Sequence, residues 1–196
     1  DRQFIDNVAT ECYFFEGDSV LNKYVGGFFD AKGQQANYFA MKAEQEAQKV
    51  KKEALTTAHY ALLYEADPSK KMVEDYITRG ICFDYQTEEL QGILVLLPTH
   101  PRTLEIVNIA VSEESRGRGI GQELLHFAID FAKKEKYDYL EIGTGSTGFQ
   151  QLYLYQKVGF RMTHIEPDFF IHHYDEPIME NGLPLKDMVR LRLHLS

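Results

Sequence analysis

The stretch TLEIVNIAVSEESRGRGIGQELLHFAIDFAKK, Thr103 to Lys134, decides the fold. It begins with nine residues rich in β-branched and apolar side chains, which are typical of a buried strand. It ends with apolar residues that recur at spacings of three and four, as on one face of an amphipathic helix. Between them lies RGRGIG, residues 116–121. The sequence therefore predicts a strand, a glycine-rich loop and a helix in direct succession.

The loop has the composition of an anion-binding site. Three glycines at alternate positions permit a curved backbone whose N–H groups face one concavity beside a helix N-terminus. Arg116 and Arg118 add positive charge. No Gly-Lys-Ser/Thr follows, so the loop is not a Walker A motif, and Gln122 breaks the dinucleotide-binding pattern. A glycine-rich turn with solvated arginines is the alternative interpretation.

A second glycine cluster, GTGSTG at residues 143–148, is a literal G-x-G-x-x-G between a predicted strand and a predicted helix. In a dinucleotide-binding protein an acidic residue follows about 20 residues later, and Glu166 stands near that position. Such a fold needs further βαβ units, and fewer than 40 residues remain after residue 165. The helix is also short for a crossover. The sequence therefore disfavours a nucleotide-dependent oxidoreductase.

Outward from these loops, the pattern predicts alternating strands and helices in one domain of residues 56–196. Strands are predicted at 58–66, 81–86, 92–98, 103–111, 137–142, 160–165 and 188–195, with Pro98 ending the third of them. Helices are predicted at about 69–79, 122–134 and 149–158. The sum is an α/β (α+β) fold with a mixed sheet flanked by helices.

Residues 1–55 read as an N-terminal extension. A weak apolar stripe predicts a helix at about residues 35–55. Because 156 residues from Met41 onward suffice for the domain, we expect the preceding segment to be an appended arm. Its aromatic residues suggest an oligomer contact, as in a homodimer.

Composition and charge disfavour several functions. The chain of 196 residues has a net charge of −9, which disfavours nucleic acid and anionic membranes as partners. No apolar run approaches the ~20 residues of a membrane-spanning helix. Two cysteines without metal-ligand spacing, Cys12 and Cys82, favour reduced thiols and a cytoplasmic location. No metal site is predicted.

Residues 104–121 resemble the acetyl-CoA-binding motif of the GNAT N-acetyltransferase superfamily, which is Q/R-x-x-G-x-G/A directly after a strand. Arg116, Gly119 and Gly121 occupy its three defined positions. LYQKVGF at residues 154–160 resembles a second motif of that family, a Tyr on a short helix followed by Gly-Phe entering a strand. The resemblance implies the GNAT fold, with a mostly antiparallel sheet, for about residues 57–196. It leaves the first 55 residues unexplained.

The resemblance also implies a cosubstrate, acetyl-CoA, and assigns residues to it. Its pyrophosphate is expected on the backbone of Arg116, Gly117, Arg118, Gly119, Ile120 and Gly121, and its pantetheine arm beside Ile109, Ala110 and Val111. Many family members have an Asn ahead of the Tyr helix. This chain has Ser146-Thr147-Gly148 there, so Ser146 or Thr147 is expected to supply the pantetheine contact.

Two residues take the expected catalytic roles. Tyr155 occupies the family position whose phenol protonates the departing thiolate, the alternative being a packed core aromatic. Glu105 is the expected base, because the histone-acetylating branch of the family places its Glu in a similar run. The alternative is a strand residue that makes a structural hydrogen bond or faces solvent.

The acceptor is expected to be a primary amine of a small molecule or peptide. Residues 162–185 contain no Lys or Arg, and five acidic residues there could form a rim for a cationic amine or a solvated loop: Glu166, Asp168, Asp175, Glu176 and Glu180. His172 and His173 are adjacent, which disfavours a shared metal on an extended chain. A non-catalytic CoA-binding module is the alternative function; the net charge disfavours a toxin that acts on charged tRNA.

Overall fold

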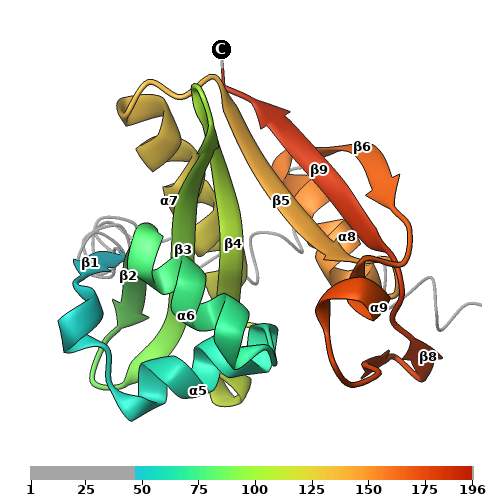
Figure 1. Ribbon diagram of the computed structural model, residues 1–196. Coiled ribbons are helices and arrows are strands. Elements are labelled where there is room, and N and C mark those ends of the chain that lie inside the picture. The colour runs from blue at the N-terminus through green and yellow to red at the C-terminus, as the bar shows by residue number, and fades with distance from the viewer. Residues whose placement is uncertain (1–46, 196) are drawn as a thin grey trace, which may run out of the picture. The chain divides into compact units, whose positions relative to one another are not determined.

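A computed structural model describes residues 47–195, which belong to one compact unit (Figure 1). Its centre is a seven-stranded sheet in the order β1-β2-β3-β4-β5-β9-β6. The strands are β1 (Gln48–Val50), β2 (Ile81–Gln86), β3 (Leu90–His100), β4 (Thr103–Val111), β5 (Tyr139–Gly145), β6 (Arg161–Glu166) and β9 (Met188–His194). Every neighbouring pair is antiparallel except β4 with β5. The predicted mixed, mostly antiparallel sheet is confirmed.

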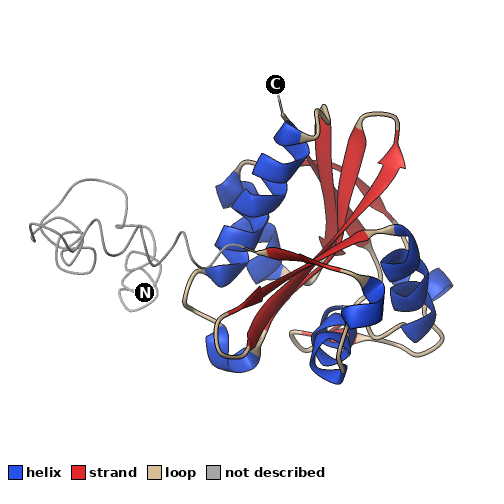
Figure 2. Cartoon of the chain, turned by 90° about the vertical axis from the view of Figure 1, so that its left-hand side faces the viewer, coloured by secondary structure: helices blue, strands red, loops and turns tan. Residues whose placement is uncertain are grey.

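Helices cover both faces of this sheet (Figure 2). One face packs against α7 (Ile120–Lys134) and α8 (Phe149–Val158), whose apolar residues join those of β3, β4 and β5 in the larger core. The other face of β2, β3 and β4 packs against α5 (Thr57–Ala66) and α6 (Lys70–Arg79) in a second core. The chain between β6 and β9 holds α9 (Phe169–His173) and the short strands β7 (Met179–Glu180) and β8 (Leu183–Pro184).

The sheet splits between β4 and β5. These strands pair only from Thr103–Tyr139 to Ile106–Ile142 and then diverge (Figure 1). The divergence coincides with a bulge in β4, because Leu96 pairs with Ile106 and Val95 pairs with Asn108, which leaves Val107 as the extra residue. A bulge bends its strand and ends regular pairing. The second half of β4 therefore has an edge that no strand within residues 47–195 covers.

One predicted strand is wrong: residues 58–66 lie in helix α5. The run AHYALLYEA contains Ala, Leu, Tyr and Glu and no β-branched residue, and Ala, Leu and Glu are strong helix formers. Its apolar residues are spread around the helix rather than gathered on one face, so periodicity does not reveal it. The start is fixed by a reciprocal cap, in which the Thr56 amide donates to Nδ1 of His59 at 3.1 Å. Nε2 of His59 then donates to Asp84 at 3.3 Å.

Two further expectations are corrected. Residues 47–55, the described part of the predicted helix at 35–55, hold strand β1 and a 3-10 turn at Lys52–Ala54; residues 35–46 lie outside the described residues. The domain therefore includes β1, which pairs with β2. Pro98 does not end β3, which continues to His100. Proline is tolerated there because β2 pairs with β3 only as far as Leu96, so no amide is needed on that side.

None of the helices among the described residues has the length and apolar character needed to cross a lipid bilayer.

Candidate functional site

A cavity of about 520 Å³ lies where β4 and β5 diverge. Its walls come from both strands, at residues 106–111 and 142–145, and from the ends of α5, α7 and α8. The segment from α9 to β9 closes it with Phe170, Tyr174, Glu180, Leu185 and Met188. The split in the sheet thus creates a cavity that reaches from the glycine loop to the acidic segment.

The glycine loop presents free amides beside the start of α7. Gly117 and Gly119 have φ of +75° and +85°, a left-handed conformation that glycine adopts without steric cost. Among the described residues, none accepts a hydrogen bond from the backbone N–H groups of residues 117–122. The first bond of the helix runs from Glu123 to Gly119 at 3.0 Å. The loop therefore has the form of the predicted anion nest.

The predicted cofactor residues divide into two groups. Ile109, Ala110, Val111, Arg116 and Gly121 line the cavity, whereas residues 117–120 and Ser146 are not part of its lining.

Several of these residues make contacts within the protein. The side chain of Ile120 lies in the core below the loop, and the amide of Ser146 donates to the Asp187 carbonyl at 2.9 Å. Arg116 forms an ion pair with Glu65, and its Nε donates to the Val111 carbonyl at 3.3 Å. Arg116 is thereby held against the end of β4.

Tyr155 lies on α8 at the floor of the cavity, and only 5% of it is exposed. No described residue forms a hydrogen bond with its hydroxyl group. Burial, assisted by the negative charge of Glu180, raises the pKa of Tyr155 above its ordinary value, so the phenol stays protonated at neutral pH. Tyr153, two residues earlier, is 45% exposed on another face of the helix. The phenol of Tyr155 thus lies at the cavity.

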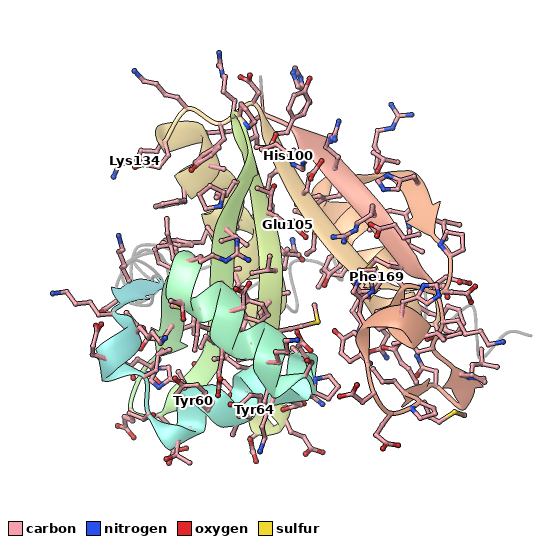
Figure 3. All side chains as sticks on the ribbon, viewed as in Figure 1. Tyr60, Tyr64, His100, Glu105, Lys134 and Phe169 are labelled. Atoms are coloured by element: carbon pink, nitrogen blue, oxygen red, sulfur yellow. The ribbon has the colours of Figure 1, made fainter. Side chains whose placement is uncertain are left out.

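Glu105 lies on β4 before the bulge (Figure 3). It is not part of the cavity lining. Its Oε1 accepts a hydrogen bond from Nη1 of Arg190 at 2.7 Å, and Nε of Arg190 donates to Glu166 at 2.5 Å. The Arg190 guanidinium also stacks 5.5 Å from the Phe169 ring. Burial raises the pKa of Glu105, while Arg190 opposes the rise. The carboxylate thus ties β4 to β9 across β5.

The glycines of GTGSTG are explained by close packing. A Cβ on Gly143 would lie 2.7 Å from Sδ of Met188 and 3.2 Å from Nη1 of Arg190. A Cβ on Gly145 would overlap Leu185, and one on Gly148 would lie 2.9 Å from Oγ1 of Thr144. Gly143 lets Arg190 cross β5 to reach Glu105. Glu166, the residue suggested for a ribose, is paired with Arg190. The G-x-G-x-x-G pattern of residues 143–148 therefore reflects close packing against neighbouring side chains rather than nucleotide binding.

We expect Gly145→Ala to lower the free energy of unfolding by about 1–3 kcal/mol, because the added methyl group forces Leu185 away. Gly121→Ala is the matched control, since its Cβ would lie 3.7 Å from Leu154, an ordinary contact. Urea denaturation measures both variants. Equal stability of Gly145→Ala and the parent chain would contradict this packing role.

The sequence does not single out Asp67 as a functional residue. It follows α5, is 8% exposed and lines the cavity. Its Oδ1 accepts hydrogen bonds from the Ser69 amide at 3.0 Å and from the Tyr174 hydroxyl at 3.1 Å. Burial raises the pKa of Asp67, although hydrogen bonds from Ser69, Tyr174 and Tyr76 oppose it. The pair Asp67-Pro68 indicates only a helix start, and nothing in the sequence connects Asp67 to Tyr174, 107 residues later.

Asp67→Asn is expected to raise the free energy of unfolding at pH 7. With a pKa above the unfolded value, Asp67 binds its proton more tightly in the folded chain. Its contribution to stability is therefore complete below the unfolded pKa of about 3.9 and is lost as pH rises through the folded pKa. Asparagine carries no charge, so the gain over the parent should shrink from pH 7 to pH 4. Urea titrations at several pH values measure the difference in the free energy of unfolding between the variant and the parent. Asp130→Asn is the control, because Asp130 is exposed.

The acidic segment is only partly at the site. Glu180 lines the cavity, where it accepts a hydrogen bond from Oγ1 of Thr147 at 2.7 Å. Glu166 pairs with Arg190, whereas Asp168, Asp175 and Glu176 are exposed. His172 and His173 lie in helix α9 rather than on an extended chain, and Nδ1 of His173 donates to the Phe169 carbonyl at 2.7 Å.

The cysteines offer no metal cluster or accessible thiol within residues 47–195. Cys82 is buried, which raises the pKa of its thiol to about 11. Cys12 and the expected oligomer contact in residues 1–40 lie outside the described residues. In the described part of the chain, no group of three His, Cys, Asp or Glu side chains is arranged to hold a metal ion.

Comparison with known proteins gives matches of one class over most of the chain. The model of the "Acetyltransferase (GNAT) family" matches residues 41–160. The uncharacterized N-acetyltransferase YvbK of Bacillus subtilis is 53% identical over 137 residues, which are 69% of this chain and 88% of that protein.

Two solved structures agree with this match. A Bacillus subtilis acetyltransferase in complex with CoA is 48% identical, with a TM-score of 0.72 over 77% of this chain and 100% of that one. A GNAT family acetyltransferase of Elizabethkingia anophelis with acetyl-CoA bound is 42% identical, with a TM-score of 0.73 over 76% of this chain and 97% of that one.

A shorter stretch resembles another class of protein. Over 52 residues, 26% of this chain, the sequence is 73% identical to the ATP-binding protein Uup-like of Haemophilus influenzae. Those residues make up 11% of that protein.

Proposed function

We propose that this chain, which belongs to the acetyltransferase (GNAT) family, transfers the acetyl group of acetyl-CoA to a primary amine of a small molecule or peptide. The observation that carries the proposal is the cavity between the diverging strands, which reaches from Arg116 and Gly121 at the two ends of the glycine loop to Tyr155 and a set of carboxylates. Relatives that are 42% and 48% identical are bound to acetyl-CoA and to CoA.

Acetyl-CoA fits the residues present as the cosubstrate. The amides of residues 117–122 and the dipole of α7 favour a pyrophosphate at the loop. Arg118 adds positive charge, whereas Arg116 is paired with Glu65. The uncovered edge of β4 at Ile109, Ala110 and Val111 offers backbone groups to an extended pantetheine arm. Thr144 lines the cavity and replaces Ser146 as the polar side chain on the β5 side.

We propose direct attack by the amine on the thioester. The buried Cys82 is not part of the cavity lining, so it is not a candidate for an acyl-enzyme. Tyr155 then protonates the departing thiolate, a role supported by its position and by its hydroxyl group without a partner among the described residues. Glu105 remains the base suggested by family resemblance. However, Glu105 is paired with Arg190 and lies outside the cavity lining. Both observations favour a carboxylate that lines the cavity as the base.

We also propose that the residues before Ala47 are an appended segment and that most of the Uup-like stretch belongs to it. The solved acetyltransferases cover 77% of the chain and leave 23% outside. A cytoplasmic location is proposed because the chain contains only two cysteines and no helix among residues 47–195 could cross a membrane.

The test is isothermal titration with acetyl-CoA, with NADH as the parallel control, followed by detection of free CoA during incubation with a panel of primary amines. Acetyl-CoA binding with amine-dependent CoA release supports the proposal. Binding without release from any amine would favour a non-catalytic CoA-binding module. Binding of NADH in place of acetyl-CoA would favour an oxidoreductase.

A further inference from the structure

Asp67 is a buried carboxylate at the cavity whose hydrogen-bond donors are all neutral. They are the Ser69 amide, the Tyr174 hydroxyl and the Tyr76 hydroxyl. Among the described residues, no Lys, Arg or His forms an ion pair with Asp67. Buried charges in proteins are ordinarily paired, because desolvation of an unpaired ion costs several kcal/mol. The chain thus holds a desolvated carboxyl group at the cavity without a cation from residues 47–195.

A fixed hydrogen-bond chain holds this carboxylate in place. Nδ2 of Asn108 donates to the Leu63 carbonyl at 3.0 Å and to the Tyr76 hydroxyl oxygen at 2.8 Å. The Tyr76 hydroxyl therefore accepts from Asn108, which leaves its own hydrogen to point toward Asp67. Tyr174 approaches Asp67 from the segment after α9. Asp67 is thus held by tyrosines from two separate parts of the chain.

Asn108 supplies an independent sign of a ligand. It is 4% exposed, it lines the cavity, and its Oδ1 is a buried acceptor with no partner among the described residues. Because both N–H groups of Asn108 are used by Leu63 and Tyr76, this oxygen is fixed as an acceptor. A buried acceptor without a donor costs about 1–3 kcal/mol. A ligand N–H group would satisfy it.

The charges around the cavity favour a cationic ligand. Glu65 is neutralised by Arg116, whereas Asp67 and Glu180 have no cationic partner among the described residues. The charged residues that line the cavity are therefore the Glu65–Arg116 pair and two carboxylates, Asp67 and Glu180. Apolar surface lies beside them, since Phe170 packs against the Tyr174 ring at 5.3 Å, and Leu185 and Met188 also line the cavity.

We propose that Asp67 binds the ammonium group of the acceptor and accepts its proton, and that the acceptor is a primary alkylammonium with an apolar body. The inference rests on the proposed acetyl transfer. Asp67 pairs with the R–NH₃⁺ group, and Oδ1 of Asn108 accepts a second N–H. After the proton moves to Asp67, the nitrogen lone pair forms a bond to the acetyl carbon. The carbon–sulfur bond then breaks.

The protons balance in this scheme. The thiolate takes a proton from Tyr155, and the phenol recovers one from the acylated nitrogen. The products are the amide and free CoA, and one proton leaves through Asp67 in each turnover. Asp67 is therefore a catalytic residue in this proposal, and Tyr76, Asn108 and Tyr174 are residues that position it.

The experiment compares the full chain with its Asp67→Asn and Glu105→Gln variants, using 2-phenylethylamine, butylamine and 1,4-diaminobutane from pH 6.5 to 9.5. General-base catalysis is worth about 10²–10⁴-fold. We therefore expect Asp67→Asn to lower kcat/KM for 2-phenylethylamine about 100-fold at pH 7, with unchanged acetyl-CoA affinity. The defect should shrink as pH rises, because a larger share of the amine is already neutral. Tyr174→Phe should give a smaller loss with the same trend.

The outcomes separate this inference from the proposed function. A loss of activity in Asp67→Asn that does not change with pH would show a structural role and overturn the inference. Activity of this variant within threefold of the parent at pH 7 would overturn it as well. A pH-dependent loss in Glu105→Gln alone would assign the base to Glu105. If the parent chain binds acetyl-CoA but acetylates no amine, the proposed function fails and the inference fails with it.

Discussion

Gly119→Glu is expected to weaken acetyl-CoA binding at least 100-fold. Gly119 stands at the N-terminus of α7 with φ of +85°, a conformation that costs an L-residue about 1–2 kcal/mol. The glutamate would also bring a negative charge to the amides proposed to hold the pyrophosphate. A 100-fold loss corresponds to about 2.7 kcal/mol, which the strain and the charge can supply together. Isothermal titration with acetyl-CoA measures the change.

Gly182→Glu is the matched control for this prediction. Gly182 has φ of +75°, and no atom lies within 4 Å of the Cβ that either substitution would add. The two variants therefore impose the same kind of strain and the same charge, but only one alters the glycine loop. We expect Gly182→Glu to bind acetyl-CoA as the parent does. Equal binding by Gly119→Glu and the parent would remove the loop from the cofactor site.

The unit formed by β4, the glycine loop and α7 could be predicted from the sequence, because the patterns that identify these elements are local. β4 has the predicted bounds at Thr103–Val111, and α7 begins at Ile120, two residues before the predicted start. The β-branched run and the amphipathic stripe identify these elements. Helix α5 escapes prediction because its apolar residues show almost no helical periodicity, and a short apolar run does not distinguish a strand from a buried helix.

The geometry of the catalytic groups depends on contacts that the sequence does not reveal. The bulge at Val107 shifts the register of β4, so Glu105 and the cavity-lining half of the strand belong to different environments. Glu105 meets Arg190, 85 residues later, because Gly143 leaves space across β5. Asp67 meets Tyr174 over 107 residues. These pairings arise from tertiary packing, so a motif could suggest Tyr155 but not the carboxylate that faces the cavity.

Tyr155→Phe is expected to lower kcat about 100-fold while leaving the affinity for acetyl-CoA within about threefold of the parent. General-acid catalysis is typically worth about 10²–10⁴-fold, and the lower end applies because a thiolate with an ordinary pKa near 8.5 is already a fair leaving group. Burial and Glu180 raise the pKa of Tyr155, so the phenol of the parent stays protonated across the working pH range. The defect should therefore decrease above about pH 8.5, where the thiolate can leave without a proton. Single-turnover CoA release measures the chemical step.

Tyr153→Phe distinguishes chemistry from packing in this measurement. It removes the same hydroxyl group from the same helix, but Tyr153 is 45% exposed and does not line the cavity. We expect parental kcat for this variant. Loss of the Tyr155 hydroxyl should cost little stability, because no described residue bonds to it, so a fall in kcat cannot be attributed to unfolding. If Tyr155→Phe keeps the parental rate at pH 7, the thiolate leaves unassisted, and Tyr155 serves only as an aromatic wall of the cavity.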